Sequence, residues 1–369
     1  MKLGLLIYGS LDTLSGGYMY DRLLVEYLRA QGDTVEIISL PWRNYAAHLT
    51  DNFWFRLWSS EASSRNGQHT LSGARAAGLQ RFDILIQDEL NHPSLIAANR
   101  RPHPYPIISL VHHLRCSELR PKWQNDLYRI VEKKYLQSVD GYIFNSETTK
   151  GVVHKLIGNS LPEVVAFPPT DRFGEAISEE EIKERGKKEE LRVLFLGNVM
   201  ERKGLITLLE AVKGQRSKVM LDVVGSLAVE PEYAKQMQNF VASNNLSSRV
   251  TFHSALNQQP LIDKLRAAHV LVVPSSYEGF GIVYLEGMGF GLPAIGTTAG
   301  AASEVIEDGV TGFLIQPGDA SSLADKLNVL NERRDLLIQM SLAARSRYLR
   351  QPKWKQTAGR IREFLLSFL

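Results

Sequence analysis

The chain has 369 residues, a net charge of +3 and one cysteine, Cys116. Hydrophobic residues make up 44% and charged residues 22%, which is typical of a soluble globular protein of about two domains. These values exclude an internal disulfide, give no support to nucleic-acid binding, and leave no apolar run of the roughly 18 residues that a membrane span needs.

The N-terminal part predicts a βαβ unit. The apolar run Leu3–Tyr8 indicates a strand buried on both faces, as in a parallel sheet. A helix over Tyr18–Ala30 and a strand over Thr34–Ser39 follow. The glycines between them do not form G-x-G-x-x-G, which disfavours a dinucleotide cofactor. The first run is too short for a signal peptide and the single cysteine suits a reducing compartment, so we expect a cytoplasmic protein.

Residues 41–75 fit no simple α/β alternation, because aromatic and arginine side chains gather there. We consider three interpretations: a helix packed onto its own domain, an acceptor-binding platform, and a peripheral membrane contact through residues 42–58, at the inner face of the membrane. The residues concerned are Trp42, Arg43, Tyr45, Phe53, Trp54, Phe55, Arg56, Leu57, Trp58, Arg65 and Arg75.

The rest of the first half continues the α/β pattern. Apolar runs predict strands at 83–87, 107–111, 141–144 and 164–167, with an amphipathic helix over Trp123–Ser138. Polar residues follow three of these strands, at Gln87-Asp88-Glu89, His112-His113 and Asn145-Ser146-Glu147. Because ligands of open α/β sheets bind beyond the carboxyl ends of the strands, these turns should line one rim.

A second α/β half begins after a charged segment. Pro168-Pro169 and the charged run Glu179–Glu190 predict a linker over residues 171–190. Strands are then expected at 192–196, 220–224, 250–252, 270–273, 294–296 and 312–315. We therefore expect an N-terminal Rossmann-like domain over residues 1–170, joined by the amphipathic tail 352–369, and a C-terminal Rossmann-like domain over residues 191–351.

The stretch Pro274–Pro293 carries the strongest functional signal. A strand ends at Pro274, a turn with Gly279 and Gly281 follows, and Gly291-Leu292-Pro293 ends a short helix. Glycines let a ligand lie against the backbone, and the free N–H groups at the start of the helix can bind a phosphate. Glu278 in the turn and Glu286 in the helix are carboxylates suited to sugar and ribose hydroxyls.

A basic turn follows the first strand of the second half. Arg202 and Lys203 can neutralise a diphosphate, and the next residue, Gly204, lets the chain turn close to it. Another strand end carries Gly225, whose backbone can approach a nucleotide.

These motifs, in this order, resemble the E-x7-E motif of retaining family 4 glycosyltransferases. The resemblance implies the GT-B fold, in which two Rossmann-like domains face each other across a cleft and a C-terminal helix crosses back to the first domain. The family's basic motif usually has an arginine where this chain has Asn198, so Arg202 would supply the second positive charge. The expected donor-binding residues are Gly16, Gly17, Asn198, Gly225, Gly279, Phe280, Gly281, Ile282 and Glu286.

The resemblance also implies roles in the first half. Gly16 and Gly17 resemble the family's paired-glycine loop, which faces the donor phosphate and the reacting sugar. His112 matches a histidine that contacts the donor sugar, whereas His113 replaces the family's aspartate, a carboxylate that could orient the acceptor. A metal site at His112, His113 and Cys116 is disfavoured because adjacent histidines diverge and no fourth ligand is near.

We therefore expect transfer of a hexose-type sugar from a UDP- or GDP-sugar, with retention, to a carbohydrate, lipid or small-molecule acceptor. The expected catalytic residues are Glu278, His112, Lys203 and Arg202. Glu278 would hold a sugar hydroxyl and Glu286 the ribose, while the two cations stabilise the leaving diphosphate. No cofactor and no metal are expected. The alternatives are a nucleotide-sugar epimerase, a phosphorylase, and a non-catalytic protein that binds a sugar nucleotide.

Overall fold

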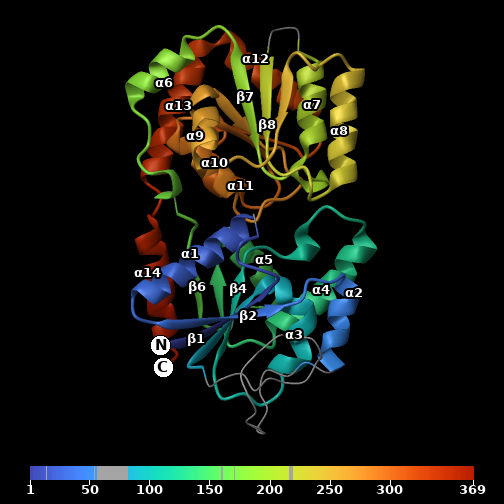
Figure 1. The fold of residues 1–369 in the computed structure, drawn as a ribbon, viewed down its shortest axis with the longest axis vertical. Coiled ribbons are helices and arrows are strands. Elements are labelled where there is room, and N and C mark those ends of the chain that lie inside the picture. The colour runs from blue at the N-terminus through green and yellow to red at the C-terminus, as the bar shows by residue number, and fades with distance from the viewer. Residues whose placement is uncertain (14, 54, 56–81, 159–160, 170, 216–218) are drawn as a thin grey trace. The chain divides into compact units, whose positions relative to one another are not determined.

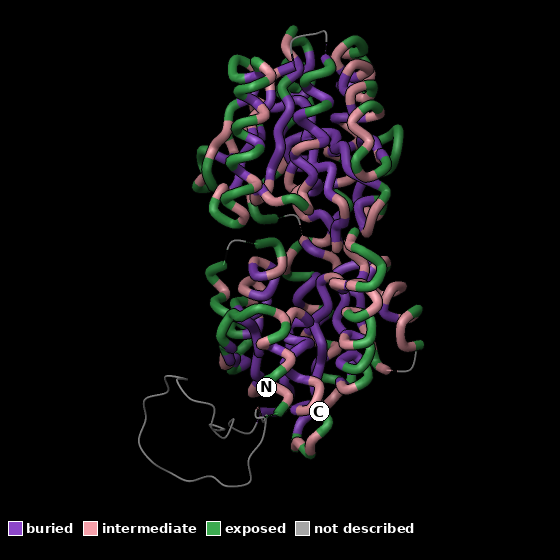
Figure 2. The backbone as a smooth tube through the Cα atoms, turned by 90° about the vertical axis from the view of Figure 1, so that its right-hand side faces the viewer, coloured by how far each residue is buried: buried purple, intermediate pink, exposed green. Residues whose placement is uncertain are grey.

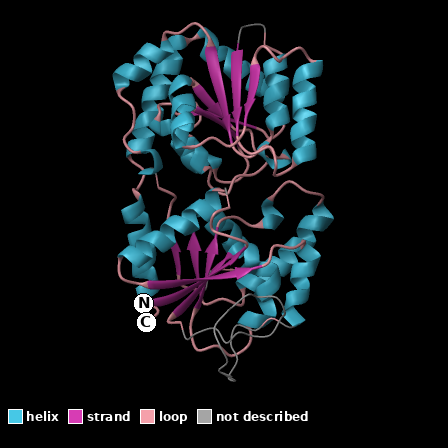
Figure 3. Ribbon diagram, viewed as in Figure 1, coloured by secondary structure: helices cyan, strands magenta, loops and turns pink. Residues whose placement is uncertain are grey.

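The computed structural model describes residues 1–369 except 14, 54, 56–81, 159–160, 170 and 216–218. The chain divides into two compact units. Unit 1 comprises Met1–Pro168 and Trp354–Leu369, and unit 2 comprises Pro169–Lys353. Each unit is a parallel sheet covered by helices (Figure 3), and buried residues fill its interior (Figure 2). The expected α/β architecture with two Rossmann-like units is confirmed.

Unit 1 contains a parallel sheet in the order β2-β1-β3-β4-β5-β6 (Figure 1). The strands are β1 (Lys2–Tyr8), β2 (Thr34–Leu40), β3 (Ile84–Asp88), β4 (Ile107–Val111), β5 (Gly141–Phe144) and β6 (Glu163–Val165). The helices are α1 (Gly16–Ala30), α2 (Tyr45–Leu49), α3 (His92–Asn99), α4 (Lys122–Leu136), α5 (Glu147–Ile157) and α14 (Trp354–Leu366), with 3₁₀ turns η1 (Thr50–Phe53), η2 (Glu89–Asn91) and η3 (Arg115–Ser117). The strand order reverses between β1 and β3, which is where open α/β sheets bind ligands.

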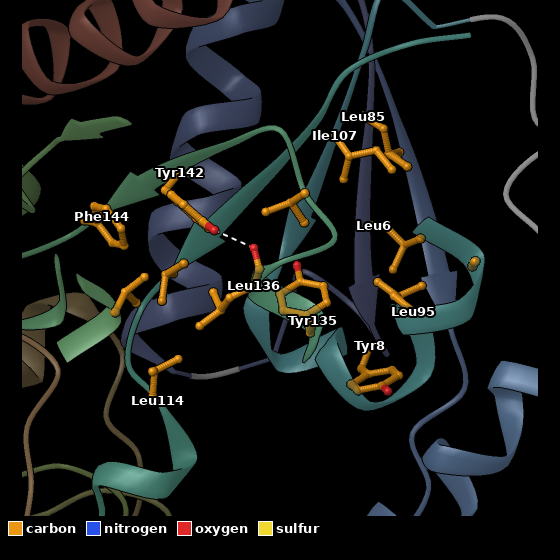
Figure 4. Packing of buried hydrophobic residues seen from close by; sticks show 14 of the residues in the cluster. Leu6, Tyr8, Leu85, Leu95, Ile107, Leu114, Tyr135, Leu136, Tyr142 and Phe144 are labelled. Carbon is orange, nitrogen blue, oxygen red and sulfur yellow. Dashed lines mark hydrogen bonds between the residues drawn. The ribbon is translucent and has the colours of Figure 1, made fainter. Parts of the chain in front are cut away.

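The apolar run of β1 builds the core on both faces of this sheet. Leu6 and Tyr8 pack into one cluster, with Tyr135 and Tyr142 among its other members (Figure 4). The alternate residues, such as Leu5, pack into a second cluster on the opposite face. This division follows from the two-residue period of a strand and explains why the run is apolar throughout.

The C-terminal helix α14 completes the second of these clusters. Its side chains Ala358, Ile361 and Leu365 are fully buried there. The indole N–H of Trp354 donates to the Leu23 carbonyl over 3.0 Å, which ties the start of α14 to α1. The tail therefore belongs to the same hydrophobic core as the N-terminal strand.

Unit 2 contains a parallel sheet in the order β12-β11-β10-β7-β8-β9. The strands are β7 (Leu191–Leu196), β8 (Val219–Val224), β9 (Val250–His253), β10 (Val270–Val272), β11 (Ala294–Thr297) and β12 (Gly312–Ile315). The helices are α6 (Glu179–Gly186), α7 (Leu205–Lys213), α8 (Pro231–Ser243), α9 (Gln258–Ala267), α10 (Ile282–Gly289), α11 (Ala302–Val305), α12 (Ala320–Glu332) and α13 (Arg334–Leu349), with 3₁₀ turns η4 (Asp171–Phe173) and η5 (Glu201–Lys203). Here the strand order reverses between β7 and β10.

Residues 179–186, within the segment expected to be a linker, form α6 and pack on unit 2. A capping box begins the helix at Ser178, where the Ser178 side chain accepts from the Glu181 backbone N–H. Ile182 is buried, and the buried Arg185 guanidinium donates to the Phe290 carbonyl over 2.8 Å. The charges of this segment therefore cover one side of the helix, while its other side joins the core of unit 2.

The aromatic segment after β2 is described only in part. Tyr45 in α2 packs on unit 1, where its hydroxyl lies 2.9 Å from His92 Nε2 and its ring lies 4.8 Å from that of Tyr128. Trp42 and Phe53 are exposed. Trp54, Arg56, Leu57, Trp58, Arg65 and Arg75 lie outside the described residues.

Two glycines of unit 2 provide a matched test of backbone packing. Gly300 (φ +77°) and Gly309 (φ +75°) both have left-handed backbones, but a Cβ at Gly300 would lie 2.1 Å from the Glu278 carbonyl oxygen, whereas nothing lies within 4 Å at Gly309. Gly309→Ala should therefore lower the free energy of unfolding by about 1–2 kcal/mol, the cost of a left-handed alanine. Gly300→Ala should cost about 3 kcal/mol or more, because the clash adds to this strain. Urea denaturation measures both, and equal losses would contradict the packing described.

Candidate functional site

The predicted site residues fall into two groups, one in each unit. In unit 2, the loops after β7 and β10 meet at the point where the strand order reverses. The Ser276 backbone N–H donates to the Arg202 carbonyl over 2.8 Å, and the Arg202 guanidinium donates to the Tyr277 carbonyl over 2.7 Å. Gly204, which follows η5 in the left-handed region (φ +68°), packs so tightly that a Cβ there would lie 2.1 Å from the Pro274 carbonyl oxygen. These contacts fix the two loops against each other.

A buried ion pair joins the same two loops. Lys203 Nζ lies 2.5 Å from Glu278 Oε1, and the Ser275 hydroxyl donates to the same oxygen over 2.6 Å. Among the described residues, no hydrogen bond reaches the other carboxylate oxygen, Glu278 Oε2. Glu278 is therefore held rigidly through one oxygen while the second can accept from a ligand.

The environment of this pair keeps Glu278 ionised. Burial alone would raise the pKa of Glu278, but the positive charges of Lys203 and Arg202, with the hydrogen bonds to the carboxylate, outweigh burial and lower this pKa to about 2. Burial lowers the pKa of Lys203, and the negative charge of Glu278 opposes that change. The result is a carboxylate that accepts hydrogen bonds over the whole neutral pH range.

Helix α10 begins immediately after this turn. Its N-cap residue, Gly281, has φ +89°, and a Cβ there would lie 2.5 Å from the Tyr284 ring. Glu286, further along α10, accepts from the Arg172 guanidinium over 2.5 Å. Burial raises the pKa of Glu286, and Arg172 opposes this effect. Arg172 itself is half-exposed, so its guanidinium can leave Glu286 at little cost when a ligand competes for the carboxylate.

The other predicted donor-binding residues of unit 2 lie next to Glu278 in the sequence or in the loops that follow β7 and β8. Gly279 is partly buried and Phe280 is buried, and Ile282 is the first residue of α10. Asn198 follows β7, in the loop that leads to η5. Gly225 follows β8, where a Cβ would lie 1.9 Å from the carbonyl oxygen of Gly197, so this glycine allows the loops after β7 and β8 to touch.

In unit 1, the paired glycines lie against the predicted histidine. Gly16 and Gly17 begin α1, whose N-cap hydroxyl, Ser15 Oγ, accepts from the Tyr18 N–H over 3.2 Å. A Cβ at Gly17 would lie 3.3 Å from His112 Cδ2, so the small residue leaves room for the imidazole. The structure therefore brings Gly17 and His112 together within this unit.

Two aspartates that sequence reasoning did not assign lie next to His112. Asp21 in α1 is fully buried, and its Oδ1 lies 3.0 Å from His112 Nε2. Burial lowers the pKa of His112. The negative charge of Asp21 and its hydrogen bond raise this pKa by more than burial lowers it, so the net shift is upward. Asp88, at the end of β3, is also fully buried; burial and the neighbouring Asp21 raise its pKa to about 7.

The two aspartates lie close together, because one ligand atom each of Asp21, Asp88 and His112 lie within 4.8 Å of one another. Asp21 Oδ2 and Asp88 Oδ2 are buried without a hydrogen-bond partner among the described residues. The raised pKa of Asp88 favours its neutral form beside Asp21, whose carboxylate contacts His112.

A second polar cluster supports the loop that follows His112. The Glu132 carboxylate accepts from the backbone N–H groups of Arg115 and Cys116, over 2.5 and 3.1 Å. Burial raises the pKa of Glu132 to about 7 and raises the pKa of the Cys116 thiol, which leaves that thiol a poor nucleophile. His113 lies 3.0 Å from Glu118 Oε1. This cluster holds the loop in one conformation.

Among the residues that the structure describes, two groups have a geometry that could hold a metal ion. The ligand atoms of Asp21, Asp88 and His112 all lie within 4.8 Å of one another, and the same is true of a second group, Glu89, His92 and Glu132. The trio of His112, His113 and Cys116, which the sequence disfavours as a metal site, is not one of them. Hydrogen bonds already use atoms of both groups: His112 Nε2 bonds Asp21 Oδ1 in the first, and Glu132 in the second accepts from the Cys116 backbone N–H.

Sequence reasoning could have found part of this network. Asp21 lies four residues after Gly17, hence on the same face of α1, and an acidic residue there points in the direction of the glycine pair. Asp88 was recognised only as part of a polar rim. Arg172 has no sequence signal, because its partner Glu286 lies more than a hundred residues away.

Comparison with known protein families gives two matches, one in each of the two compact units. The profile described as "Glycosyl transferases group 1" matches residues 177–347, and the one described as "Glycosyltransferase Family 4" matches residues 18–168. A phosphatidyl-myo-inositol mannosyltransferase of Mycobacterium leprae is 25% identical over 98% of this chain and 95% of its own length. A D-inositol 3-phosphate glycosyltransferase of Streptomyces griseus is 33% identical, but over 41% of this chain and 34% of that enzyme.

Solved structures share the fold over the whole chain. A sucrose-phosphate synthase from Thermosynechococcus elongatus has a TM-score of 0.78 at 19% identity, covering 99% of this chain and 98% of that one. HepE of Anabaena, solved in complex with UDP and glucose, has a TM-score of 0.72 at 18% identity and is covered in full, as is this chain. At such identities the likeness shows the fold alone, and that fold is GT-B.

Removing the cation of the buried ion pair should destabilise unit 2. In Lys203→Met the Glu278 carboxylate stays buried without its cation, so we expect a loss of about 3–5 kcal/mol in the free energy of unfolding at neutral pH. The pair contributes stability above the unfolded pKa of Glu278, 4.5, and this contribution is lost as the pH falls towards the folded value of about 2. Urea denaturation should therefore show a deficit that shrinks with acidification.

The double variant Lys203→Met/Glu278→Gln is the control for this prediction. It removes both charges and keeps an oxygen that can accept from Ser275, so most of the lost stability should return. A double variant as unstable as the single one would show that packing of the lysine, rather than the unpaired carboxylate, is responsible.

The aspartate network of unit 1 predicts a lowered His112 pKa in Asp21→Asn. This variant removes the negative charge that contacts the imidazole, and Asp88→Asn, the matched control, should lower the same pKa less because it leaves that contact intact. Because Asp21 raises the folded pKa of His112, its stabilising effect is present at acidic pH and is lost as the pH rises through that pKa. NMR titration of ¹⁵N-labelled histidine, assigned with His112→Gln, measures the shifts. Equal shifts in both variants would contradict a specific role for Asp21.

Proposed function

The chain belongs to glycosyltransferase family 4, and on this premise we propose that it transfers a hexose-type sugar from a UDP- or GDP-sugar to a carbohydrate, lipid or small-molecule acceptor, with retention and without a metal. The observation that carries the proposal is the geometry of Glu278, an ionised carboxylate anchored through Oε1 to Lys203 and Ser275. Its second oxygen can accept from a hydroxyl of the donor sugar.

The donor's diphosphate would bind at the N-terminus of α10. The N–H groups there carry the partial positive charge of the helix, and Gly281 brings no side chain that would block them. Lys203 and Arg202 add two positive charges against the single negative charge of Glu278, so the site retains a net cationic character. Negative charge accumulates on the diphosphate as the glycosidic bond breaks, and these fixed charges lower the barrier.

Glu286 would accept hydrogen bonds from the ribose hydroxyls, which would replace its hydrogen bond from the Arg172 guanidinium. The ion pair between these two side chains is exposed on the arginine side, so it contributes little to stability and can be replaced. The freed guanidinium would then lie near the nucleotide, as an additional cation. This step makes Arg172 a candidate donor-binding residue in unit 2.

In unit 1, Gly17 and His112 would contact the sugar. The imidazole of His112 is held at Nε2 by Asp21, which fixes the ring and favours its protonated form. Held in this way, His112 would donate a hydrogen bond from its other nitrogen to an oxygen of the donor. Reaction within a short-lived ion pair on one face of the sugar would retain the configuration, and the departing phosphate would take the acceptor proton.

The relatives support the substrate class. One relative is named a phosphatidyl-myo-inositol mannosyltransferase, a name that contains both a hexose and a lipid. HepE was crystallised with UDP-glucose, a nucleotide sugar. The proposal therefore includes lipid, carbohydrate and small-molecule acceptors for this chain. Contact of residues 42–58 with an acceptor or a membrane is part of the proposal, and Trp42 and Phe53 are the exposed side chains that support it. We place the protein in the cytoplasm, in keeping with its single, buried cysteine.

A thermal-shift panel of UDP-, GDP- and ADP-sugars tests the donor. A ligand at about 100 times its dissociation constant stabilises the native state by about 2.7 kcal/mol, which should raise the melting temperature by several degrees for the true donor class. Lys203→Met/Glu278→Gln should lose this response while remaining folded, and Glu286→Gln should weaken it for the free nucleotide as well. No shift with any donor would contradict the proposal.

Incubation of the donor so identified then separates the reaction classes. A transferase needs an added acceptor, and the anomeric configuration of its product, read by NMR, should match that of the donor. Release of free nucleotide with an altered sugar and no acceptor would instead identify an epimerase. Inversion at the anomeric carbon would contradict the retaining mechanism.

A further inference from the structure

Helix α4 of unit 1 exposes an apolar stripe that the proposed reaction does not use. Trp123, Leu127 and Ile130 are 63%, 57% and 54% exposed, and Leu119, just before the helix, is 64% exposed. Spacings of four and three residues place the three helical side chains within one narrow arc. Single exposed apolar residues are ordinary, but a continuous stripe of this kind marks an interaction surface.

The stripe lies opposite the face by which α4 joins its own unit. Glu132, Tyr135 and Leu136 are buried, and at about 100° per residue they lie on the far side of the helix from Trp123. The helix thus has two apolar faces, of which one is already packed in the core. The outer face needs no role in folding, so it is available to a partner.

Lysines border the stripe. Lys122, Lys133 and Lys134 are exposed and form no ion pair among the described residues, whereas the nearby Arg129 is paired with Asp126. Lys134 continues the line of the three apolar side chains along the helix. An apolar stripe with a tryptophan and unpaired lysines matches the surface of an anionic bilayer, where apolar side chains enter the interface and lysines meet phosphate groups.

We propose that α4, with Leu119, is a docking surface for an anionic lipid bilayer. The helix would lie in the plane of the interface, with Trp123, Leu127 and Ile130 inserted among the acyl chains. No helix among the described residues is both long and apolar enough to cross a bilayer, so such attachment would be peripheral and reversible. The proposal is independent of the reaction and differs from the contact proposed for residues 42–58.

A second copy of the chain fits this surface less well. A symmetric pairing through α4 would bring the lysines of both copies close together, and unpaired like charges in an interface are unfavourable. A bilayer of anionic lipid supplies the opposite charge along the whole stripe. Charge complementarity therefore favours the lipid surface.

Vesicle sedimentation tests this surface with the whole chain. We expect binding to vesicles of phosphatidylcholine and phosphatidylglycerol in equal parts, weaker binding to phosphatidylcholine alone, and loss of binding at high salt. Trp123→Ser/Leu127→Ser/Ile130→Ser should reduce the partition coefficient by roughly a hundredfold, because each buried side chain contributes separately. Lys133→Gln/Lys134→Gln should reduce it by roughly twenty-five-fold, at about fivefold for each lysine.

Matched variants elsewhere control for general effects. Leu349→Ser and Val310→Ser remove exposed apolar side chains of unit 2, and Lys235→Gln removes an exposed lysine there; none should change vesicle binding. Because the stripe is exposed, its variants should keep the melting temperature of the parent chain. An unchanged response to a UDP- or GDP-sugar would show that docking and donor binding are separable.

Three results would overturn the proposal. The first is no sedimentation with phosphatidylglycerol vesicles, and the second is undiminished binding by the triple serine variant. The third is a dimer in analytical ultracentrifugation that the triple variant converts to a monomer, since this would make a second copy the occupant of the stripe.

Discussion

The ion pair of Lys203 and Glu278 is the contact on which the organisation of unit 2 depends. It joins the loops after β7 and β10, the two strands between which the order of the sheet reverses. A buried pair of this kind contributes little net stability, since desolvation offsets most of the attraction. The pair keeps the charge of Glu278 at a defined place at the start of α10, and an ionised carboxylate accepts hydrogen bonds more strongly than an uncharged side chain.

Unit 1 has a different arrangement of charges where the strand order of its sheet reverses, between β1 and β3. There two buried aspartates lie beside His112, and the charge of Asp21 favours the protonated form of the imidazole. The glycine at position 17 and the acid at position 21 serve the same imidazole, one by leaving space and the other by orienting the ring. Both units thus place a fixed, desolvated charge at the carboxyl ends of neighbouring strands.

Local patterns in the sequence predicted the sheets well and the electrostatic network poorly. The apolar run of β1 predicts a buried strand because both faces of its sheet are covered. The turn from Pro274 to Gly281 predicts a helix start because a proline ends the strand and two glycines follow. By contrast, α6 was interpreted as a linker from its charges, since its buried Ile182 contributes one apolar residue to a highly charged run. Asp21 and Arg172 depend on partners distant in the chain, and no local pattern reveals such pairs.

The placement of α14 has a consequence for biosynthesis. The hydrophobic core of unit 1 requires Ala358, Ile361 and Leu365, which follow every residue of unit 2 in the chain and are therefore synthesised after them. The nascent chain can complete unit 2 first, whereas the unit that contains β1 must wait for α14. A chaperone that recognises uncovered apolar surface would find it on the sheet of unit 1 until α14 has been synthesised.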